Sequence, residues 1–464
     1  MEIEFSKTKK IVFTISPYMT IKSISYALVG LLILHSPPGH ASTFLAQLQL
    51  TLEHEPSLIS SQRDIDISSA RKDQALGELL PKIDLSGGMN RNRRNYQQKQ
   101  SLFPSSTEYY DSNSWQINFS QPIINFAAIF NLRQNLHYLD QANLIKLATE
   151  QELIAKYIET WMSIQSALAN VDAESAKKDY AASELSKAKI GHLNDLVNEP
   201  ELIRAQAEFD IASSDVDQAA SELEIAISNL ELLSGQAPST EIALLEPKLD
   251  RLNAPFETNT QLELSNTLNP RINAAKKAAD AAKQEIQKQS AGLLPTLELV
   301  ANYSEKKQQE GDYPSQSGYS DKAGYVGLQL NIPIFSGGGQ LAKKKEAQAQ
   351  YEKALSDIEK ERRNATQRLK QALQEYASAQ RRQRAMHTSL SAAQLELVAA
   401  RRSRDFGNGS DIEVFKAQLQ VANTKRDEIK AICDKVSAYF NIKANTASIN
   451  EADIQQLAEI FVEP

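Results

Sequence analysis

Four short stretches of the chain alternate between apolar and polar residues. The clearest is 323–334, where Val, Leu and Ile occupy every second position and Tyr, Gly, Gln and Asn fill the positions between. The others lie near 81–90, 113–123 and 295–304. Alternation with a period of two puts apolar side chains on one face of a strand and polar ones on the other. We predict four strands, each with one face in an apolar medium and one in water.

Much longer stretches have the composition of helices. No Gly or Pro occurs from 127 to 190 or from 340 to 406, and Ala, Leu, Glu, Gln, Lys and Arg dominate both stretches. At ~1.5 Å per residue, each would make a helix about 100 Å long, which favours coiled-coil packing. We predict that Gly191, and Gly407 with Gly409, end these helices and that return helices follow at about 200–233 and 411–443.

A further helical stretch precedes each strand pair, at about 43–78 and 258–291, and ends at a Leu-Leu-Pro sequence. Between the two strands of each pair lie connections rich in Asn, Gln, Ser, Tyr and Gly, at about 91–111 and 304–322. We predict that these connections are exposed loops.

The order of elements repeats along the chain. Pro81 and Pro295, each following Leu-Leu, are 214 residues apart, whereas Pro122 and Pro333, each following a strand, are 211 apart. A nearly constant offset indicates duplication. We predict a first repeat at 42–255, a second at 256–446 and a C-terminal tail at 447–464, with a proline-containing joint near 238–255.

The N-terminus has the pattern of an export signal. Four lysines precede an uncharged apolar run at 24–34, and helix-breaking prolines and small residues up to Ala41 follow. We predict a signal peptide at 1–41, with Met19 as an alternative start of translation. A membrane-anchoring or buried N-terminal helix is the alternative, although the run is short for a span.

Composition excludes several classes of protein. The formal net charge is −7, and basic clusters such as 343–345 lie among Glu and Gln without interleaved aromatic residues, which argues against nucleic-acid binding. Cys433 is the only cysteine, so an internal disulfide is impossible. Beyond the N-terminus no apolar stretch is long enough for a membrane-spanning helix.

Four amphipathic strands can cross a bilayer only inside a closed barrel, because an open sheet edge leaves backbone groups unpaired in hydrocarbon. Single-chain bacterial barrels begin at about eight strands. Several protomers must therefore contribute if the strands cross a membrane. The alternative is a small water-exposed β-subdomain that caps a helical bundle.

The export signal, the two equivalent halves and the sequence Pro-Ile-Phe-Ser-Gly-Gly-Gly at 333–339 together resemble the TolC family of outer-membrane channel proteins. The resemblance covers about 43–445. It implies an α+β membrane protein with a duplicated strand pair and long helical hairpin, forming a homotrimer with a twelve-stranded β-barrel on an α-helical periplasmic tunnel. It also implies an outer-membrane location in a Gram-negative bacterium, and a periplasmic adaptor protein and an inner-membrane transporter as partners in type I secretion or efflux.

The resemblance also suggests a gate at the helix tips. Glu413 falls at an acidic constriction position and Glu201 at the partner position in the first half. Three carboxylates around a narrow pore favour cations. Lys416 and Gly409 depart from the family pattern, and Arg404 is the candidate for a replacement salt bridge. Solvated tip charges of little energetic value are the alternative.

No catalytic chemistry is predicted. The six histidines lack metal-ligand spacing, and the glycines at 337–339 match neither phosphate-binding motif. We predict instead that Pro122, Pro333, Gly337, Gly338 and Gly339 form the turns between barrel and tunnel. We expect a passive channel without cofactors and without enzymatic activity. The alternative functions are a periplasmic coiled-coil scaffold without a pore and the adaptor protein itself.

Overall fold

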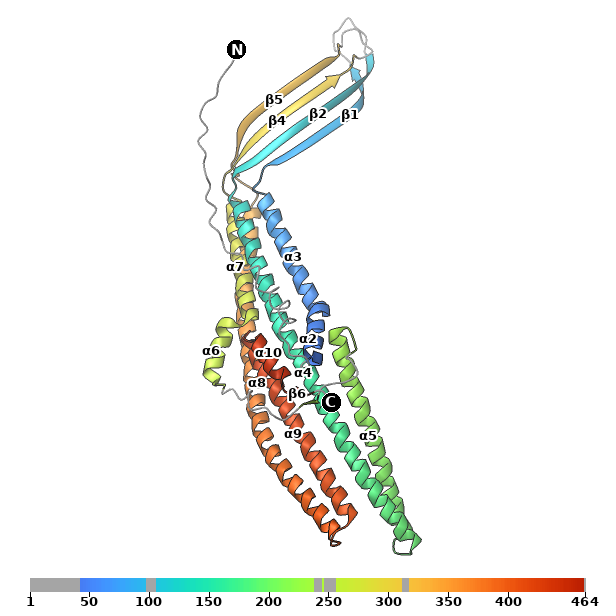
Figure 1. The fold of residues 1–464 in the computed structure, drawn as a ribbon. Helices are drawn as coiled ribbons and strands as arrows, with labels where there is room; N and C mark the ends of the chain where they lie inside the picture. Colours follow the sequence, from blue (N-terminus) through green and yellow to red (C-terminus); the bar gives the residue numbers. More distant parts are fainter. Residues whose placement is uncertain (1–41, 97–105, 238–243, 246–255, 311–316, 463–464) are drawn as a thin grey trace.

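The computed structural model describes residues 42–96, 106–237, 244–245, 256–310 and 317–462. The predicted signal peptide at 1–41 and most of the predicted joint near 238–255 lie outside these residues. The molecule is elongated, with a β-sheet at one end, helices along its length and two helix tips at the other end (Figure 1).

Two very long helices run most of the length of the helical part. α4 spans Phe126–Leu193 and α8 spans Gly339–Asp405. Each turns back into a return helix, α5 (Glu199–Ser234) and α9 (Asp411–Asn445). α4 packs against α5, α7 and α9, while α8 packs against α7 and α9. The two halves are thus interlocked along their length rather than folded as separate units.

Each helical stretch predicted before a strand pair consists of two consecutive helices. The first consists of α2 (Ser42–His54) and α3 (Pro56–Gly77), and the second of α6 (Thr258–Leu268) and α7 (Pro270–Ala291). In both cases proline is the first residue of the second helix, where its missing N–H costs no hydrogen bond. Asn269 caps α7 by accepting hydrogen bonds from the backbone N–H groups of Arg271 and Ile272.

The four predicted strands form one antiparallel sheet in the order β1-β2-β4-β5. β1 spans Lys82–Tyr96, β2 Ser106–Ile124, β4 Thr296–Gln308 and β5 Tyr319–Asn331. The predicted loops at about 91–111 and 304–322 were therefore too long, because the strands continue through polar residues. The fold class predicted from the sequence, a duplicated strand pair plus a long helical hairpin, is confirmed by this arrangement.

The largest buried cluster lies midway along the helices. Trp161 of α4 is fully buried, and its ring lies 5.3 Å from that of Phe44 and 5.8 Å from that of Phe461. The predicted C-terminal tail contributes to this core, since it folds as α10 (Glu451–Ala458) and β6 (Phe461–Val462), which pairs with β3 (Leu244–Leu245). Both ends of the described chain therefore pack on the middle of α4.

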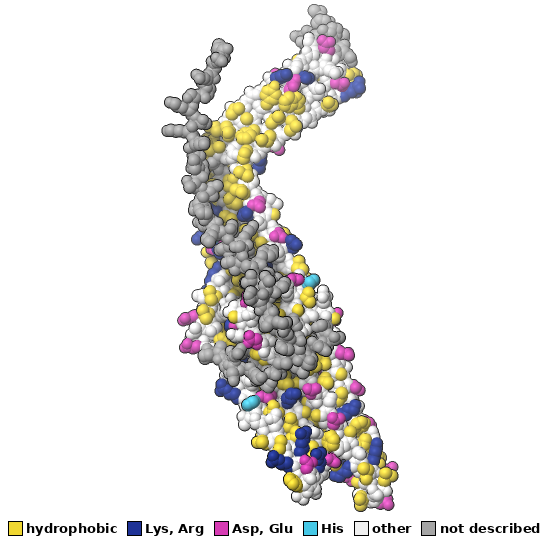
Figure 2. Space-filling view, viewed as in Figure 1, with side chains coloured by type: hydrophobic (Ala, Val, Ile, Leu, Met, Phe, Trp, Pro, Cys, Tyr) yellow, Lys and Arg dark blue, Asp and Glu magenta, His cyan; other side chains and the backbone are white. Residues whose placement is uncertain are grey.

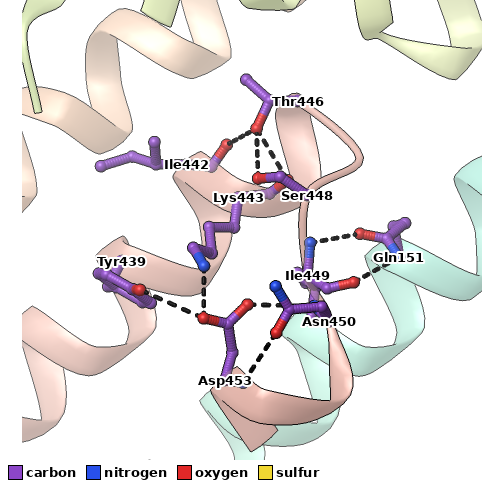
Figure 3. Close-up of polar contacts among 9 residues, drawn as sticks. All are labelled: Gln151, Tyr439, Ile442, Lys443, Thr446, Ser448, Ile449, Asn450 and Asp453. Carbon is purple, nitrogen blue, oxygen red and sulfur yellow. Dashed lines mark hydrogen bonds and ion pairs between the residues drawn. The ribbon is translucent and has the colours of Figure 1, made fainter. Parts of the chain in front are cut away.

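Polar contacts fix the C-terminal segment in place (Figure 3). Gln151 of α4 donates to the carbonyl of Ile449 at 3.4 Å and accepts from its N–H at 3.1 Å. Asp453 accepts from Lys443 and caps α10 together with Asn450. The buried amide and the ion pair satisfy groups that burial would otherwise leave unpaired.

Candidate functional site

The sheet has two chemically different faces. The strand registers place Ile83, Phe119, Ala301 and Val326 on one row and Leu85, Ile117, Tyr303 and Gly324 on the next. We call this side of the sheet the apolar face; Figure 2 shows hydrophobic side chains gathered over the sheet. The residues between, such as Ser86, Asn118, Asn302 and Gln329, lie on the opposite, polar face.

Large apolar side chains on the apolar face are open to solvent in the single chain. Leu85 is 73% exposed, Met89 87% and Leu328 68%. A monomeric water-soluble protein rarely leaves a continuous apolar surface of this kind uncovered. Within the described residues, the outer edges of β1 and β5 pair with no further strand. The sheet is therefore incomplete by itself at its apolar face and at both edges.

Of the residues predicted to form the turns between sheet and helices, Pro333, Gly337 and Gly338 lie in the connecting segment 332–338, whereas Pro122 and Gly339 lie within a strand and a helix. Pro122 lies within β2, at an irregularity in the pairing with β4, three residues before the N-cap Asn125 of α4. Pro333 is the second residue after β5. Gly337 and Gly338 have φ values of 64° and 79°, a left-handed backbone that favours glycine, and Gly338 is the N-cap of α8. Gly339 begins the helix and is not among the residues with positive φ.

The first helix tip joins α4 to α5. Gly191 lies inside the last turn of α4, so the prediction that it ends the helix was wrong, and the helix continues to Leu193. Its role is to allow close approach, because a Cβ there would lie 2.5 Å from Cγ2 of Val197. Asp195, with φ of 59°, makes the reversal. Glu201 is exposed, and its backbone N–H donates to the Asn198 side chain that caps α5.

The second tip joins α8 to α9. Gly407, with φ of 75°, makes this reversal. The Glu413 carboxylate accepts from the backbone N–H of Ser410 at 3.3 Å, and the Ser410 hydroxyl accepts from the Glu413 N–H, which is a capping box. Gly409 allows this packing, since a Cβ there would lie 3.1 Å from Oε2 of Glu413. Glu413 therefore has a structural role in addition to any role in a gate.

Arg404 forms its ion pairs within the second tip. Its guanidinium lies 2.9 Å from Asp405 and 3.5 Å from Asp411, and the hydrogen bond to Asp405 raises the pKa of Arg404 above its ordinary value. The candidate replacement salt bridge therefore exists within one tip, with Asp411 rather than Glu413 as the carboxylate of α9.

Sequence reasoning missed an apolar surface at the tips. Leu193 and Leu196 are each 82% exposed, Phe406 is 79% exposed, and Ile190 and Ile203 are more than half exposed. We call these five residues the tip patch. The signal was present in the sequence, because leucines at 193 and 196 are unusual in a polar turn. Four of these residues belong to the first tip and Phe406 to the second; exposed apolar side chains at the ends of long hairpins are typical of a protein-binding surface.

A cluster of charged residues that the sequence did not reveal connects α4, α5 and α9, on the sheet side of the tips. Lys177 of α4 donates to Asp215 of α5 at 2.6 Å and to Glu174 at 3.2 Å, and the hydrogen bond to Asp215 raises the pKa of Lys177. Glu174 also lies 3.8 Å from Arg426 of α9. Through Lys177, α4 is thus linked to α5 of the first half, and through the half-buried Glu174 it is linked to α9 of the second half.

The described part of the chain contains no cluster of His, Cys, Asp and Glu that could hold a metal ion. Nor is any helix within the described residues long and apolar enough to cross a membrane. Burial raises the pKa of the Cys433 thiol to about 12. A thiol with so high a pKa is a poor nucleophile, as expected of a buried structural cysteine.

Comparison with known proteins identifies the family. The profile of the outer membrane efflux protein family matches residues 47–236 and 262–447. The chain is 24% identical over 456 residues to the proteases secretion protein PrtF of Dickeya chrysanthemi, covering 94% of each chain. It is likewise 24% identical to the alkaline protease secretion protein AprF of Pseudomonas aeruginosa, covering 96% of this chain and 92% of the relative.

A solved structure supports the fold. The outer membrane protein VceC of Vibrio cholerae superposes with a TM-score of 0.70 at 17% identity, covering 88% of this chain and 96% of that one. The family profile matches two segments that each contain a strand pair and a long helical hairpin, in agreement with the duplication. The chain therefore belongs to the outer membrane efflux protein family.

Proposed function

We propose that three copies of this chain form a passive exit duct through the outer membrane of a Gram-negative bacterium. The observation that supports this most strongly is the incomplete sheet: it has one apolar face, one polar face and two edges that pair with no strand in the described part of the chain. Closure into a barrel by further copies pairs the edges, turns the apolar face to lipid and encloses a polar lumen. A trimer contributes twelve strands in this arrangement.

The helices then continue the duct below the membrane. α4 and α8 have 68 and 67 residues, so each measures about 100 Å at ~1.5 Å per residue. Exposed apolar side chains remain on the single chain along α5, where Ile211, Ile225 and Leu232 are each more than half exposed. Neighbouring copies that pack side by side would cover them, and this supports a helical tunnel in the periplasm.

The duct serves type I secretion or efflux in this proposal. Two similar relatives, PrtF and AprF, carry names that describe secretion of proteases, which favours a protein as the cargo. The partners are a periplasmic adaptor and an inner-membrane transporter, which supplies the energy because the duct itself performs no catalysis. The tip patch is where we place the adaptor, since it is the exposed apolar surface farthest from the sheet (Figures 1 and 2).

We propose that Glu201, Glu413 and Arg404 belong to a gate at the tips. Both glutamates lie at the third position of a return helix, one at each tip. Their common position at the open end of the two hairpins supports a ring of carboxylates around a constriction. Arg404 holds Asp411 in the same turn and so sets the shape of the second tip.

The test is fractionation followed by electrophoresis without heating. The duct is expected in the outer membrane as a trimer that resists detergent. A periplasmic coiled-coil scaffold without a pore would appear in the water-soluble fraction, and that result would refute the proposal. As the matched control, the heated sample should migrate at the size of the monomer. Single-channel currents in planar bilayers then show whether the trimer has a pore.

A further inference from the structure

The two unpaired edges of the sheet contain enough information to specify how neighbouring copies join. If β5 of one copy pairs with β1 of the next, as the proposed function requires, many antiparallel registers are conceivable. The alternation of faces removes half of them, because a shift by one residue would turn the apolar face of one copy into the polar lumen. The remaining registers differ by two residues. Two features of the chain select the same one.

The first feature is the duplication. The spacings of 214 and 211 residues match β1 to β4 and β2 to β5. The structure agrees with these spacings, since Ile83 lies opposite Phe119 in the first hairpin and the matching residues, Leu297 and Leu330, lie opposite each other in the second. The two hairpins therefore have the same register as well as the same order of elements.

The junction between the two hairpins is then a template for the junction between copies. β2 pairs with β4 so that Phe119 lies opposite Ala301. Under the same two spacings, Phe119 matches Leu330 and Ala301 matches Gly87. A barrel that repeats the junction seen inside one copy thus places Leu330 opposite Gly87 of the next copy.

The second feature is the end of the apolar face that lies farthest from the helices, which we call its limit. Moving away from the helices, the last large apolar or aromatic residue before the polar residues of this face is Met89 in β1, Trp115 in β2, Tyr303 in β4 and Val326 in β5; Tyr109 lies farther along β2, beyond Asn113 and Asp111. These four residues do not lie opposite one another. Met89 lies opposite Asn113, Trp115 opposite Glu305, and Tyr303 opposite Gly324. The limit therefore moves two residues toward the helices with each strand.

A regular slant of this kind is what a flat membrane surface produces on tilted strands. The polar residues just beyond the limit include Arg91 and Glu305, and Trp115 donates to Glu305 at 3.1 Å, an arrangement typical of the membrane interface. If the limit also moves by two residues between β5 and β1 of the next copy, the residue opposite Val326 lies two positions beyond Met89, on the side away from the helices. That residue is Arg91.

Leu330 opposite Gly87 and Val326 opposite Arg91 belong to one antiparallel register, since each strand advances four residues between the two pairs. Both features use the strand pairing within one copy, but the duplication adds the proline spacings and the apolar limit adds the pattern of hydrophobicity. We propose that β5 pairs with β1 of a neighbouring copy in this register, which places Gly327 opposite Asn90 on the polar face.

Cysteine cross-linking tests the register on the water-filled side. Gly327→Cys is combined with Gly88→Cys, Asn90→Cys or Asn92→Cys in turn, in a Cys433→Ala background. A Cβ added at Gly327 would have no other atom within 4 Å. A Cβ added at Gly88 would have its nearest neighbour, Nδ2 of Asn90, 4.0 Å away, so both glycines can accept a side chain. All three partners lie on the polar face, and neighbouring partners differ by two residues. Outer membranes are oxidised and run on heated, non-reducing gels.

We expect the pair with Asn90→Cys to form covalent dimers and trimers about tenfold faster than the other two pairs. Directly opposite Cβ atoms are ~5 Å apart and diagonal ones ~7–8 Å, beyond ordinary disulfide geometry. Gly327→Cys with Val300→Cys is the matched control, because these residues lie opposite each other within one copy. It shows that the oxidant can reach the thiol introduced at position 327.

The outcomes separate the register from the function. Fastest cross-linking with Gly88→Cys or Asn92→Cys overturns the proposed register and leaves the trimeric duct intact. If none of the three pairs links copies while the control disulfide forms, the sheet is not closed by β1 of a second copy, and the proposed duct fails with the register.

Discussion

The tip carboxylates make a prediction that separates charge from structure. Glu413→Ala would remove a charge and also half of a capping box, which costs about 0.5–2 kcal/mol by itself. Glu413→Gln removes only the charge, because glutamine also serves at this position of a capping box. Glu201→Gln makes the equivalent change at the first tip, where the cap is provided by Asn198 instead.

The size of the effect follows from the charges at each tip. The second tip, 404–416, has two cations and three carboxylates, which leaves one negative charge. The first tip, 189–204, also has two cations and three carboxylates and the same net charge. In the proposed trimer the six tips therefore hold six negative charges in excess. The two substitutions together reduce this excess to zero, and either one alone halves it.

A potential of this size is measurable in a narrow pore. At ~10 Å and an ionic strength of ~0.1 M, each net charge stabilises a monovalent cation by about 0.15 kcal/mol after screening, so that six contribute about 1 kcal/mol. This corresponds to roughly a fivefold enrichment of cations, since 1.4 kcal/mol is a factor of ten. The double substitution is expected to abolish cation selectivity, measured as the reversal potential across a planar bilayer under a KCl gradient.

Asp66→Asn in α3 is a matched control, because it also neutralises an exposed carboxylate but lies toward the sheet end of the helices (Figure 1). It should leave the reversal potential unchanged. The selectivity of the unmodified channel should also decrease in 1 M salt, where the Debye length is ~3 Å. If the double substitution leaves the reversal potential as it was, the tip carboxylates do not control the pore and the gate lies elsewhere.

Two further predictions concern single side chains. Because burial raises the pKa of Cys433 to about 12, the thiol should resist maleimide at every pH below that value in the folded protein and react within minutes in denaturant; rapid labelling of the native trimer would contradict its burial. Gly191→Ala should destabilise the first tip by about 1–3 kcal/mol, because its Cβ would overlap Val197, and Val197→Ala in the same chain should restore the melting temperature measured by circular dichroism.

The sequence was sufficient to predict the elements that depend on local patterns. Period-two alternation marked the strands, and the absence of Gly and Pro marked α4 and α8 to within a few residues. Proline was harder to interpret. Pro81 lies four residues after the end of α3, whereas Pro56 and Pro270 begin α3 and α7. Asn269 before Pro270 caps its helix with its side chain, but Glu55 before Pro56 makes no such hydrogen bond, so the preceding residue does not reveal the role of the proline.

The candidate site was predictable in position and not in contacts. The tips were located from Gly191 and Gly407, the first only to within a few residues, but the pairing of Arg404 with Asp411 depends on the backbone path of one turn. The ionic cluster could not be predicted, because Glu174 and Lys177 of α4 contact Arg426 of α9 and Asp215 of α5, and no sequence motif joins these helices. The aromatic contact of Phe461 with Trp161 joins residues 300 positions apart in the sequence, and the local hydrophobic pattern cannot predict a contact between segments so far apart.

The strand register also restricts what can travel through the duct. Ile83 lies opposite Phe119, and Phe119 lies opposite Ala301, which corresponds to Gly87 in the first repeat. Crossing one strand pair therefore shifts the register by four residues, from position 83 to position 87, and we call this shift the climb. Carried around the six repeats of the proposed trimer in the proposed register, the climb is a shear of about 24, which with strand spacings of ~4.8 Å and a rise of ~3.3 Å gives a backbone radius of roughly 16 Å. Side chains on the polar face narrow this opening further. A folded domain of ~100 residues, with a radius of gyration near 13 Å, does not fit, whereas a single helix of ~10–12 Å diameter does. Protein cargo would therefore have to leave the cell unfolded and fold only outside it.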